Sequence, residues 1–359
     1  MRIAVIGATG NVGTAVLSRL QRAARDREAI ERSGYDTSGD TDGIAITAIA
    51  RTIPDTAQAP YDGIDWHAID IGTDEGREAL VLALAGVDAV VHLAWAIQPN
   101  HDEPAMRRTN VTGTANALHA AGTAGVRQFV CASSVAAYSR AGKDTRRDEA
   151  WPTDGVRSSQ YSRQKAEQER LLDAFEQAYP EIAVARLRPG LIFQSGAGSE
   201  VGRYFLGPLV PKILLGVPLP VLPVPAAFIF QAVHAEDVAD AYWRVVARRA
   251  SGAFNIAAEP ELTPARLADL LDARRVIGLP VRVLRWIVGA SWWLRVQRTD
   301  PGWIDLAAQS PVMDTTRARS ELGWEPRHSS REAVAEVLAG MRRGDGHAGS
   351  PKMYPRSRN

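Results

Sequence analysis

Short apolar runs alternate with longer helix-forming stretches over the first 190 residues. The apolar runs have the length of buried strands and lie at about 3–6, 44–50, 64–69, 88–93, 128–132 and 182–187. A helix rich in charged residues follows residue 10 and runs into a surface loop before 43, and further helices are expected at 73–85, 104–124 and 159–178. This alternation predicts an α/β protein with a doubly wound parallel sheet and helices on both faces.

The pattern changes after about residue 190. Residues 204–229 are apolar and contain six prolines, a density that excludes a continuous helix and therefore a membrane span. We interpret this stretch as a lid whose apolar surface suits an apolar substrate. We expect residues 191–229 and 259–342 to form a smaller mixed substrate-binding region, about 230–258 to complete the main sheet, and the polar segment 343–359 to be a disordered tail.

Three helices are expected in this second half, at about 235–247, 264–276 and 332–341. Thr263 and Pro264 supply an N-cap and a first helical position for the middle one. The aromatic segment 281–294 fits three places: the protein core, a dimer contact or a membrane-surface helix.

Composition narrows the class of protein only a little. The chain has 359 residues, 45% of them hydrophobic and 23% charged, and a net charge of +1, which gives no sign of a nucleic-acid partner. Its one cysteine, Cys131, excludes an intrachain disulfide and fits a reducing, cytoplasmic location. The start of the chain is a short strand followed by glycine and is unlike a signal peptide. The seven histidines show no spacing with acidic residues or with Cys131 that indicates a metal site.

A glycine motif directly follows the first strand. Gly7, Gly10 and Gly13 are spaced as G-x-x-G-x-x-G between that strand and a helix. In this position the first glycine permits a tight turn, the second lets the backbone approach a pyrophosphate, and the third lets the helix pack against the strand. The helix N-terminus then faces the phosphates. The motif therefore predicts a dinucleotide site in a domain spanning residues 1–190.

The end of the second strand bears on the choice of cofactor. NAD-binding folds place an acidic residue there for the ribose 2′-hydroxyl. Here Ala50 stands in that place and Arg51 follows. A guanidinium in place of a carboxylate suits a 2′-phosphate, so we favour NADP and keep NAD as the alternative.

Tyr161 and Lys165 are four residues apart in a helix-forming stretch, so their side chains share one helical face. A lysine cation close to a phenol favours the phenolate and lowers its pKa toward neutrality. The pair is therefore a candidate proton shuttle. Ser134 follows the fifth strand, so we expect it at the edge of the sheet where the strands end, together with the glycine motif and Tyr161.

Taken together, these motifs resemble the extended short-chain dehydrogenases/reductases, the NAD-dependent epimerase/dehydratase family. The resemblance covers about residues 1–340. It rests on the glycine motif, Asp70, His92-Leu93-Ala94, Asn110-Val111-x-Gly113-Thr114, Ser133-Ser134 with Tyr138, Tyr161-x-x-x-Lys165, Arg188-Pro189-Gly190, His234-x-x-Asp237, Phe254-Asn255-Ile256 and Gly323-Trp324.

The resemblance implies a role for each matching residue. Tyr161 would be the general acid/base, Lys165 the residue that adjusts its pKa and binds ribose, and Ser134 the donor to the substrate oxygen, with Ser133 the less favoured neighbour. Asp70 would accept a hydrogen bond from the adenine amino group, and Ala94 would lie along the phosphates and ribose of the cofactor. Pro189 and Gly190 would lie beside the nicotinamide amide. Asn110 is left outside the catalytic set, and His92 is expected to be a core histidine. The full predicted cofactor-binding set is Gly7, Thr9, Gly10, Asn11, Val12, Gly13, Arg51, Asp70, Ile71, Leu93, Ala94, Trp95, Tyr161, Lys165, Pro189 and Gly190.

The resulting hypothesis is an oxidoreductase that passes hydride between nicotinamide and the carbinol or ketone carbon of a fairly apolar small molecule. The alternatives are a sugar-nucleotide epimerase with tightly bound NAD and a non-catalytic NADP-binding redox sensor. Sugar dehydration is disfavoured because Val135-Ala136 follow Ser134, where the family's dehydratases carry Asp-Glu. The resemblance also implies a possible homodimer, with helix 159–178 as a candidate contact.

Overall fold

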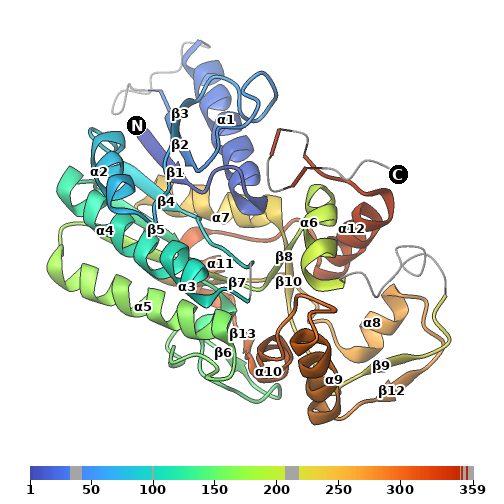
Figure 1. Ribbon diagram of the computed structural model, residues 1–359. Coiled ribbons are helices and arrows are strands. Elements are labelled where there is room, and N and C mark those ends of the chain that lie inside the picture. The colour runs from blue at the N-terminus through green and yellow to red at the C-terminus, as the bar shows by residue number, and fades with distance from the viewer. Residues whose placement is uncertain (33–42, 99–100, 207–217, 348, 351–352, 355–359) are drawn as a thin grey trace.

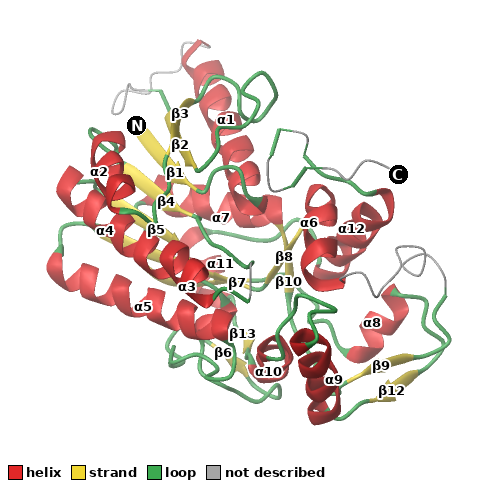
Figure 2. Ribbon diagram, in the orientation of Figure 1, coloured by secondary structure: helices red, strands yellow, loops and turns green. Residues whose placement is uncertain are grey.

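The computed structural model describes residues 1–32, 43–98, 101–206, 218–347, 349–350 and 353–354. At its centre is a seven-stranded parallel sheet in the order β11-β7-β5-β4-β1-β2-β3 (Figures 1 and 2). Its strands are β1 (Arg2–Ile6), β2 (Ala45–Ala50), β3 (Asp65–Ala68), β4 (Ala89–His92), β5 (Gln128–Ala132), β7 (Ala183–Pro189) and β11 (Gly252–Ile256). The predicted doubly wound α/β fold is confirmed, and β11 completes the sheet as expected.

Helices cover both faces of the sheet, as the alternation predicts. Side chains alternate between faces along a strand, so Ile3 and Val5 of β1 pack with α1 (Asn11–Arg32) and α7 (Ala235–Arg248). Ala4 and Ile6 pack on the opposite face with α2 (Asp74–Ala83), α4 (Gly113–Ala124) and α5 (Gln160–Ala178). Both layers are fully buried, which explains why the strands read as continuous apolar runs.

The remaining elements lie beside the sheet. Three short parallel pairs join β8 (Leu191–Phe193) to β10 (Ala232–His234), β9 (Leu222–Val224) to β12 (Val276–Gly278), and β6 (Arg146–Arg147) to β13 (Val312–Met313). The helices here are α6 (Gly198–Val201), α8 (Pro264–Leu270), α9 (Val281–Trp293), α10 (Gly302–Gln309), α11 (Thr316–Leu322) and α12 (Ser330–Arg343). No helix of the described residues is both long and apolar enough to cross a membrane.

One predicted helix boundary was wrong. The helix expected at 104–124 is helical from Glu103 to Ala124, with a π-helical turn (Arg108–Thr112) between α3 (Glu103–Arg107) and α4. The helix expected at 264–276 ends at Leu270, because the chain turns through Asp272 with φ 49° and continues into β12. Within the predicted lid, residues 222–224 form β9, whereas 207–217 lie outside the described residues, as does the loop at 33–42.

The described part of the tail is ordered against the first βα turn, contrary to the expected disorder. The Ser350 hydroxyl donates to the Thr9 carbonyl at 2.6 Å, and Ser350 and Met353 are buried. His347 packs edge-on against Tyr61, with ring centroids 5.1 Å apart. Residues 348, 351–352 and 355–359 of the predicted tail lie outside the described residues.

Candidate active site

The glycine loop is packed tightly between the ends of β1 and β4. Gly7 has φ 89°, and a Cβ there would lie 2.6 Å from the Ala94 nitrogen. A Cβ on Gly13 would lie 2.4 Å from the Gly7 carbonyl oxygen, so α1 can approach β1 only with glycine at this position. A Cβ on Gly10 would instead meet nothing nearer than the Gly7 oxygen at 3.6 Å, which leaves its backbone open to a ligand. The loop therefore fits the pyrophosphate of a dinucleotide.

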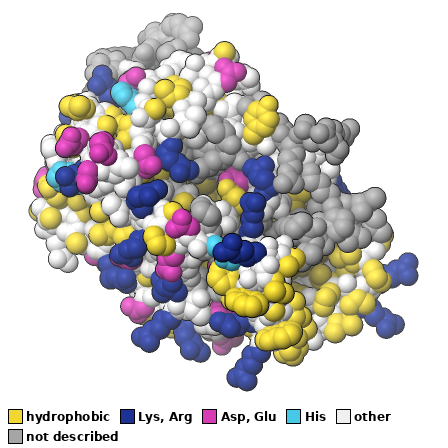
Figure 3. Space-filling view, in the orientation of Figure 1, with side chains coloured by type: hydrophobic (Ala, Val, Ile, Leu, Met, Phe, Trp, Pro, Cys, Tyr) yellow, Lys and Arg dark blue, Asp and Glu magenta, His cyan; other side chains and the backbone are white. Residues whose placement is uncertain are grey.

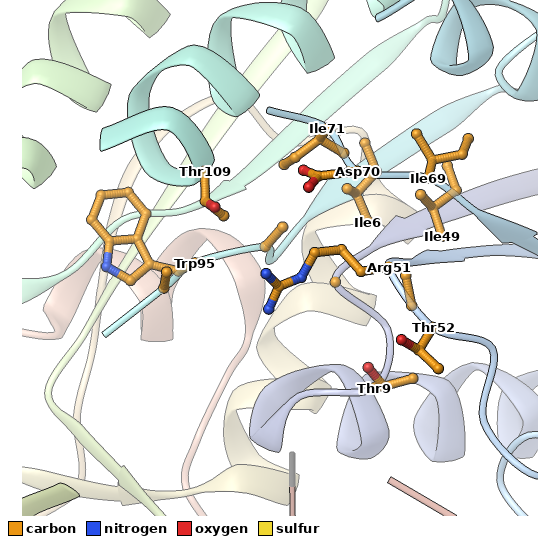
Figure 4. Close-up of a pocket in the computed structure, with 14 residues that line it drawn as sticks. Ile6, Thr9, Ile49, Arg51, Thr52, Ile69, Asp70, Ile71, Trp95 and Thr109 are labelled. Carbon is orange, nitrogen blue, oxygen red and sulfur yellow. The ribbon is translucent and has the colours of Figure 1, made fainter. Parts of the chain in front are cut away.

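A pocket opens beside this loop at the carboxyl ends of β1, β2, β3 and β4 (Figure 4). Seven of the predicted cofactor residues line it: Gly7, Thr9, Arg51, Asp70, Ile71, Ala94 and Trp95. Ile6, Ile49, Ala50, Thr52, Ile69, Ala96 and Thr109 complete the lining. Asp70 accepts from the Gly72 N–H at 3.0 Å, and the exposed Arg51 extends across the pocket toward Trp95. An apolar slot with one cation and one carboxylate suits an adenosine moiety.

The other predicted cofactor residues lie around this pocket. Asn11 joins the start of α1 to the segment around β8, because its side chain donates to the Ile192 carbonyl and accepts from Gln194. Val12 and Leu93 are partly buried against the core. Gly190 follows β7 together with Pro189, and a Cβ there would lie 2.5 Å from the Gln231 oxygen, so this glycine also has a packing role.

Tyr161, Ser134 and Lys165 come together at the next strand end. Ser159 caps the start of α5, which places Tyr161 in the first turn of that helix. Ser134 forms a hydrogen bond with Tyr161 and also accepts from the Ala136 N–H at 3.1 Å. Ser133 points the other way and donates to Glu169. The geometry thus pairs the phenol with Ser134, the serine favoured from the sequence.

Two tryptophans enclose the phenol. Trp95, which follows β4, meets the Tyr161 ring edge-on at 5.8 Å between centroids. Trp303, on α10, lies at 4.9 Å. Trp95 comes from the first half of the chain and Trp303 from the second, so the Tyr161 phenol lies between apolar walls contributed by both halves.

The pKa of Tyr161 departs from its ordinary value in the direction opposite to our expectation. Burial raises it, and the hydrogen bond with Ser134 only partly offsets that effect. Lys165 does not supply the expected opposing charge, because its ammonium group is directed elsewhere. It donates to the Ala132 carbonyl at 2.7 Å and to Gln168 at 3.0 Å, and lies 3.4 Å from the centre of the Trp95 ring. Tyr161 is therefore a protonated phenol at neutral pH, which is the form that donates a proton.

Lys165 is 2% exposed, and burial lowers its pKa to about 7. The unfolded chain keeps this lysine protonated up to about pH 10.4, so between these values the unfolded state binds more protons than the folded state. Lys165 should therefore make the free energy of unfolding rise as the pH increases from about 7 to about 10. We expect Lys165→Met to reduce this rise, as measured by urea unfolding at pH 7 and pH 9. An unchanged rise would contradict a lowered pKa for the buried Lys165 amine. Lys143, whose pKa is lowered to about 8, is present in both proteins and contributes equally to each.

A buried ionic network that we did not predict lies next to this site and joins α5 to β7. Glu169 is 1% exposed and accepts from Arg188 Nε at 2.9 Å and Nη2 at 3.0 Å, and from Arg186 at 3.2 Å. Burial would raise the pKa of Glu169, but its contacts with the two arginines outweigh burial and lower it. The signal was present in the sequence: Tyr161, Lys165 and Glu169 recur every four residues on one helical face.

Asn110 and His92 are structural in this arrangement. The Asn110 side chain accepts from the Ala96 N–H at 2.6 Å and donates to the Ala96 carbonyl and to Gln164, so it fixes the segment that carries Trp95. His92 is fully buried with Nε2 3.0 Å from the Thr114 hydroxyl, and burial lowers its pKa to about 3. It is a neutral core histidine, as expected.

One group of potential metal ligands, His234, Glu236 and His328, occurs among the described residues. His234 Nδ1 caps α7 by accepting from the Glu236 N–H at 3.2 Å, and its Nε2 lies 3.0 Å from Glu336. His328 Nδ1 lies 3.1 Å from Asp237. Two of the four imidazole nitrogens, His234 Nδ1 and His328 Nδ1, are thus hydrogen-bonded to residues in the first turn of α7, which favours a structural role for this group.

Comparison with known proteins agrees with this geometry. The model of the NAD dependent epimerase/dehydratase family matches residues 3–257. An uncharacterized protein of Mycobacterium tuberculosis is 27% identical over 346 residues, which are 95% of this chain but 30% of that protein. The chain therefore spans about a third of the length of the first curated relatives it matches.

Two further relatives match over nearly their whole length. A 3-diazoavenalumate denitrifying reductase from a Streptomyces species is 26% identical over 92% of this chain and 97% of its own. The structure of Thermus thermophilus UDP-glucose 4-epimerase in complex with NAD superposes with a TM-score of 0.63 at 18% identity, covering 96% of this chain and 99% of that one. At 18% sequence identity, this similarity shows that the two proteins share a fold.

Proposed function

Since the chain belongs to the NAD-dependent epimerase/dehydratase family, we propose that it is an NADP(H)-dependent oxidoreductase that reduces the carbonyl group of an apolar small molecule. The observation that carries this proposal is the Tyr161 phenol, which lies between Trp95 and Trp303 with Ser134 as its hydrogen-bond partner, at a strand end next to the dinucleotide pocket. The relative described as a reductase supports the same class of reaction.

Each side chain has a part in such a reduction. A bound nicotinamide cofactor supplies the hydride. Tyr161 donates its proton to the substrate oxygen as negative charge develops there, and Ser134 donates a hydrogen bond to that oxygen. Lys165 lies within the wall formed by Trp95 and the end of β5, where its amine can bind the ribose hydroxyls. Trp95 and Trp303 exclude water and favour a flat, apolar substrate.

Arg51 supports NADP as the cofactor. It lines the adenosine-sized pocket at the end of β2, where a carboxylate would otherwise bond a ribose hydroxyl. We expect Arg51→Ala to weaken NADPH binding about tenfold at low ionic strength, because an exposed charge-assisted contact to the 2′-phosphate is lost. NADH binding should change little.

Fluorescence titration with both nucleotides measures this effect, and Arg77→Ala on α2 is a matched control outside the pocket. Equal losses for NADH and NADPH would contradict a 2′-phosphate contact.

The proposed reaction is tested by adding NADPH to the purified protein with a panel of aryl ketones, terpenoid ketones, steroids and UDP- or dTDP-sugars. We expect NADPH to be consumed in proportion to product with at least one apolar ketone. The competing reaction is epimerization of a sugar nucleotide, in which the hydride returns to its origin. Turnover of a sugar nucleotide with tightly held NAD, and no consumption of added NADPH, would support that alternative and contradict the proposal.

A homodimer through the solvent-facing side of α5 is a separate part of the proposal. Sedimentation velocity tests it: a monomer across the micromolar range would contradict it.

A further inference from the structure

Among the described residues of the substrate half, helix α9 (Val281–Trp293) is the one long apolar helix, and none of its residues is buried. Trp286 is 73% exposed and Trp293 77%, and Leu294 directly after the helix is 63% exposed. Val283, Ile287 and, on the neighbouring strand β12, Val276 and Ile277 are also exposed. We call these seven residues the α9 patch. Of the three places predicted for this segment, the protein core is therefore wrong.

The exposed apolar residues of the α9 segment lie on one side of the helix. Val283, Trp286, Ile287, Trp293 and Leu294 are spaced by three, one, six and one residues, which places them along a single side of the helix. The opposite side packs against α10, where Arg285 pairs with Asp305 at 2.8 Å. Figure 3 shows hydrophobic side chains gathered over α9 with Lys and Arg side chains around their edge. A contiguous apolar surface of this kind marks an interaction site.

The charge of the segment around α9 indicates which kind of partner the patch would bind. Residues 272–298 contain six arginines, 274, 275, 282, 285, 295 and 298, and one acidic residue, Asp272, so this segment carries a net charge of +5. The whole chain carries +1, so the rest of the molecule is net negative. Arg274, Arg275, Arg282 and Arg295 form no ion pair with any described carboxylate, and all four are exposed. Positive charge is thus concentrated where the tryptophans are exposed.

We propose that the α9 patch and its arginines dock on an anionic lipid bilayer, with the helix lying in the plane of the interface. Tryptophan and leucine would enter the headgroup–acyl boundary, and the arginines would contact lipid phosphates. A second copy of the chain fits less well, because a twofold contact would bring two segments of charge +5 together. The contact also has a geometric consequence: α10, which packs on α9, carries Trp303 against Tyr161, so a docked protein presents its substrate region to the membrane.

The test is co-sedimentation of the full chain with vesicles of phosphatidylcholine alone or mixed with phosphatidylglycerol. We expect binding to the anionic vesicles, weak binding to the neutral ones, and weakening as salt is added. Trp286→Ser combined with Trp293→Ser should lower the partition coefficient at least about tenfold, and Arg274→Ser combined with Arg275→Ser about tenfold.

The matched control is Leu82→Ser on α2, which removes an equally exposed hydrophobic side chain (79%) from a different surface and should leave binding within about twofold. Absence of binding to anionic vesicles would overturn the proposal. So would binding that the two double variants do not weaken, provided that their melting temperatures match the parent. A dimer in sedimentation velocity that dissociates in the double tryptophan variant would assign the patch to a second copy instead.

Discussion

Replacing Tyr161 with phenylalanine is expected to lower kcat/KM by roughly 10²–10⁴-fold, the range found when a positioned general acid is removed. The phenyl ring keeps the contacts with Trp95 and Trp303, so the walls of the site should remain in place. Only the proton and the hydrogen bond with Ser134 are lost. Initial rates with NADPH and the substrate identified from the panel measure the effect, and NADPH titration shows whether the cofactor still binds.

Tyr179→Phe is the matched control, because it removes a hydroxyl from the C-cap of the same helix, far along α5 from Tyr161. It should leave kcat/KM within about twofold. Full turnover by Tyr161→Phe with normal cofactor affinity would show that another group supplies the proton, and the catalytic assignment of Tyr161 would be wrong.

Replacing Glu169 with glutamine is expected to lower the free energy of unfolding by roughly 3–5 kcal/mol, because the buried Arg188 guanidinium then lacks its carboxylate partner. Arg186 keeps its ion pairs with Asp173 and Glu176. Arg186 and Arg188 are each 5% exposed, and Arg188 also donates to the Tyr138 hydroxyl at 3.0 Å. Urea unfolding measures the loss. The control, Glu167→Gln, removes a solvent-facing partner of Arg107 and should cost at most about 1 kcal/mol.

The pH dependence of this effect has a definite sign. The pKa of Glu169 is lower in the folded protein than its unfolded value of about 4.3. Its stabilising contribution is therefore complete above that value and is lost as the pH falls through the folded pKa. The difference between parent and Glu169→Gln should shrink in acid. A difference that is small at pH 7, or that grows in acid, would contradict the ionised buried carboxylate.

Much of the fold was predictable because its signals are local. Continuous apolar runs such as Ile3–Ile6 can only be central parallel strands when helices alternate with them, and the glycine spacing fixes the first βα turn. The position of Arg51 and Asp70 in one pocket then follows from the rule that strand ends meet at one edge. Ser134 follows β5 and Tyr161 lies in the first turn of α5, so these two residues also meet at that edge.

The errors came from features that depend on tertiary context. The direction of the Lys165 ammonium is set by the Ala132 carbonyl and the Trp95 ring, which no spacing along α5 reveals. The spacing along α5 puts Glu169 on the face of Tyr161 and Lys165, but its pairing with Arg188 joins α5 to β7 and cannot be read from either segment alone. Tryptophans at helical spacing usually pack inside, and only the placement of α9 at the outer edge shows that these do not. The tail reads as disordered by composition, yet Ser350 has a partner in Thr9.

The most direct test of the central claim is a crystal structure of the complex with NADP⁺. The account predicts that the pyrophosphate lies over Gly10, that the 2′-phosphate contacts Arg51, and that nicotinamide C4 and the Tyr161 hydroxyl can reach the same substrate carbonyl group. A nicotinamide ring on the far side of Trp95, with Tyr161 closed off from it, would contradict the account.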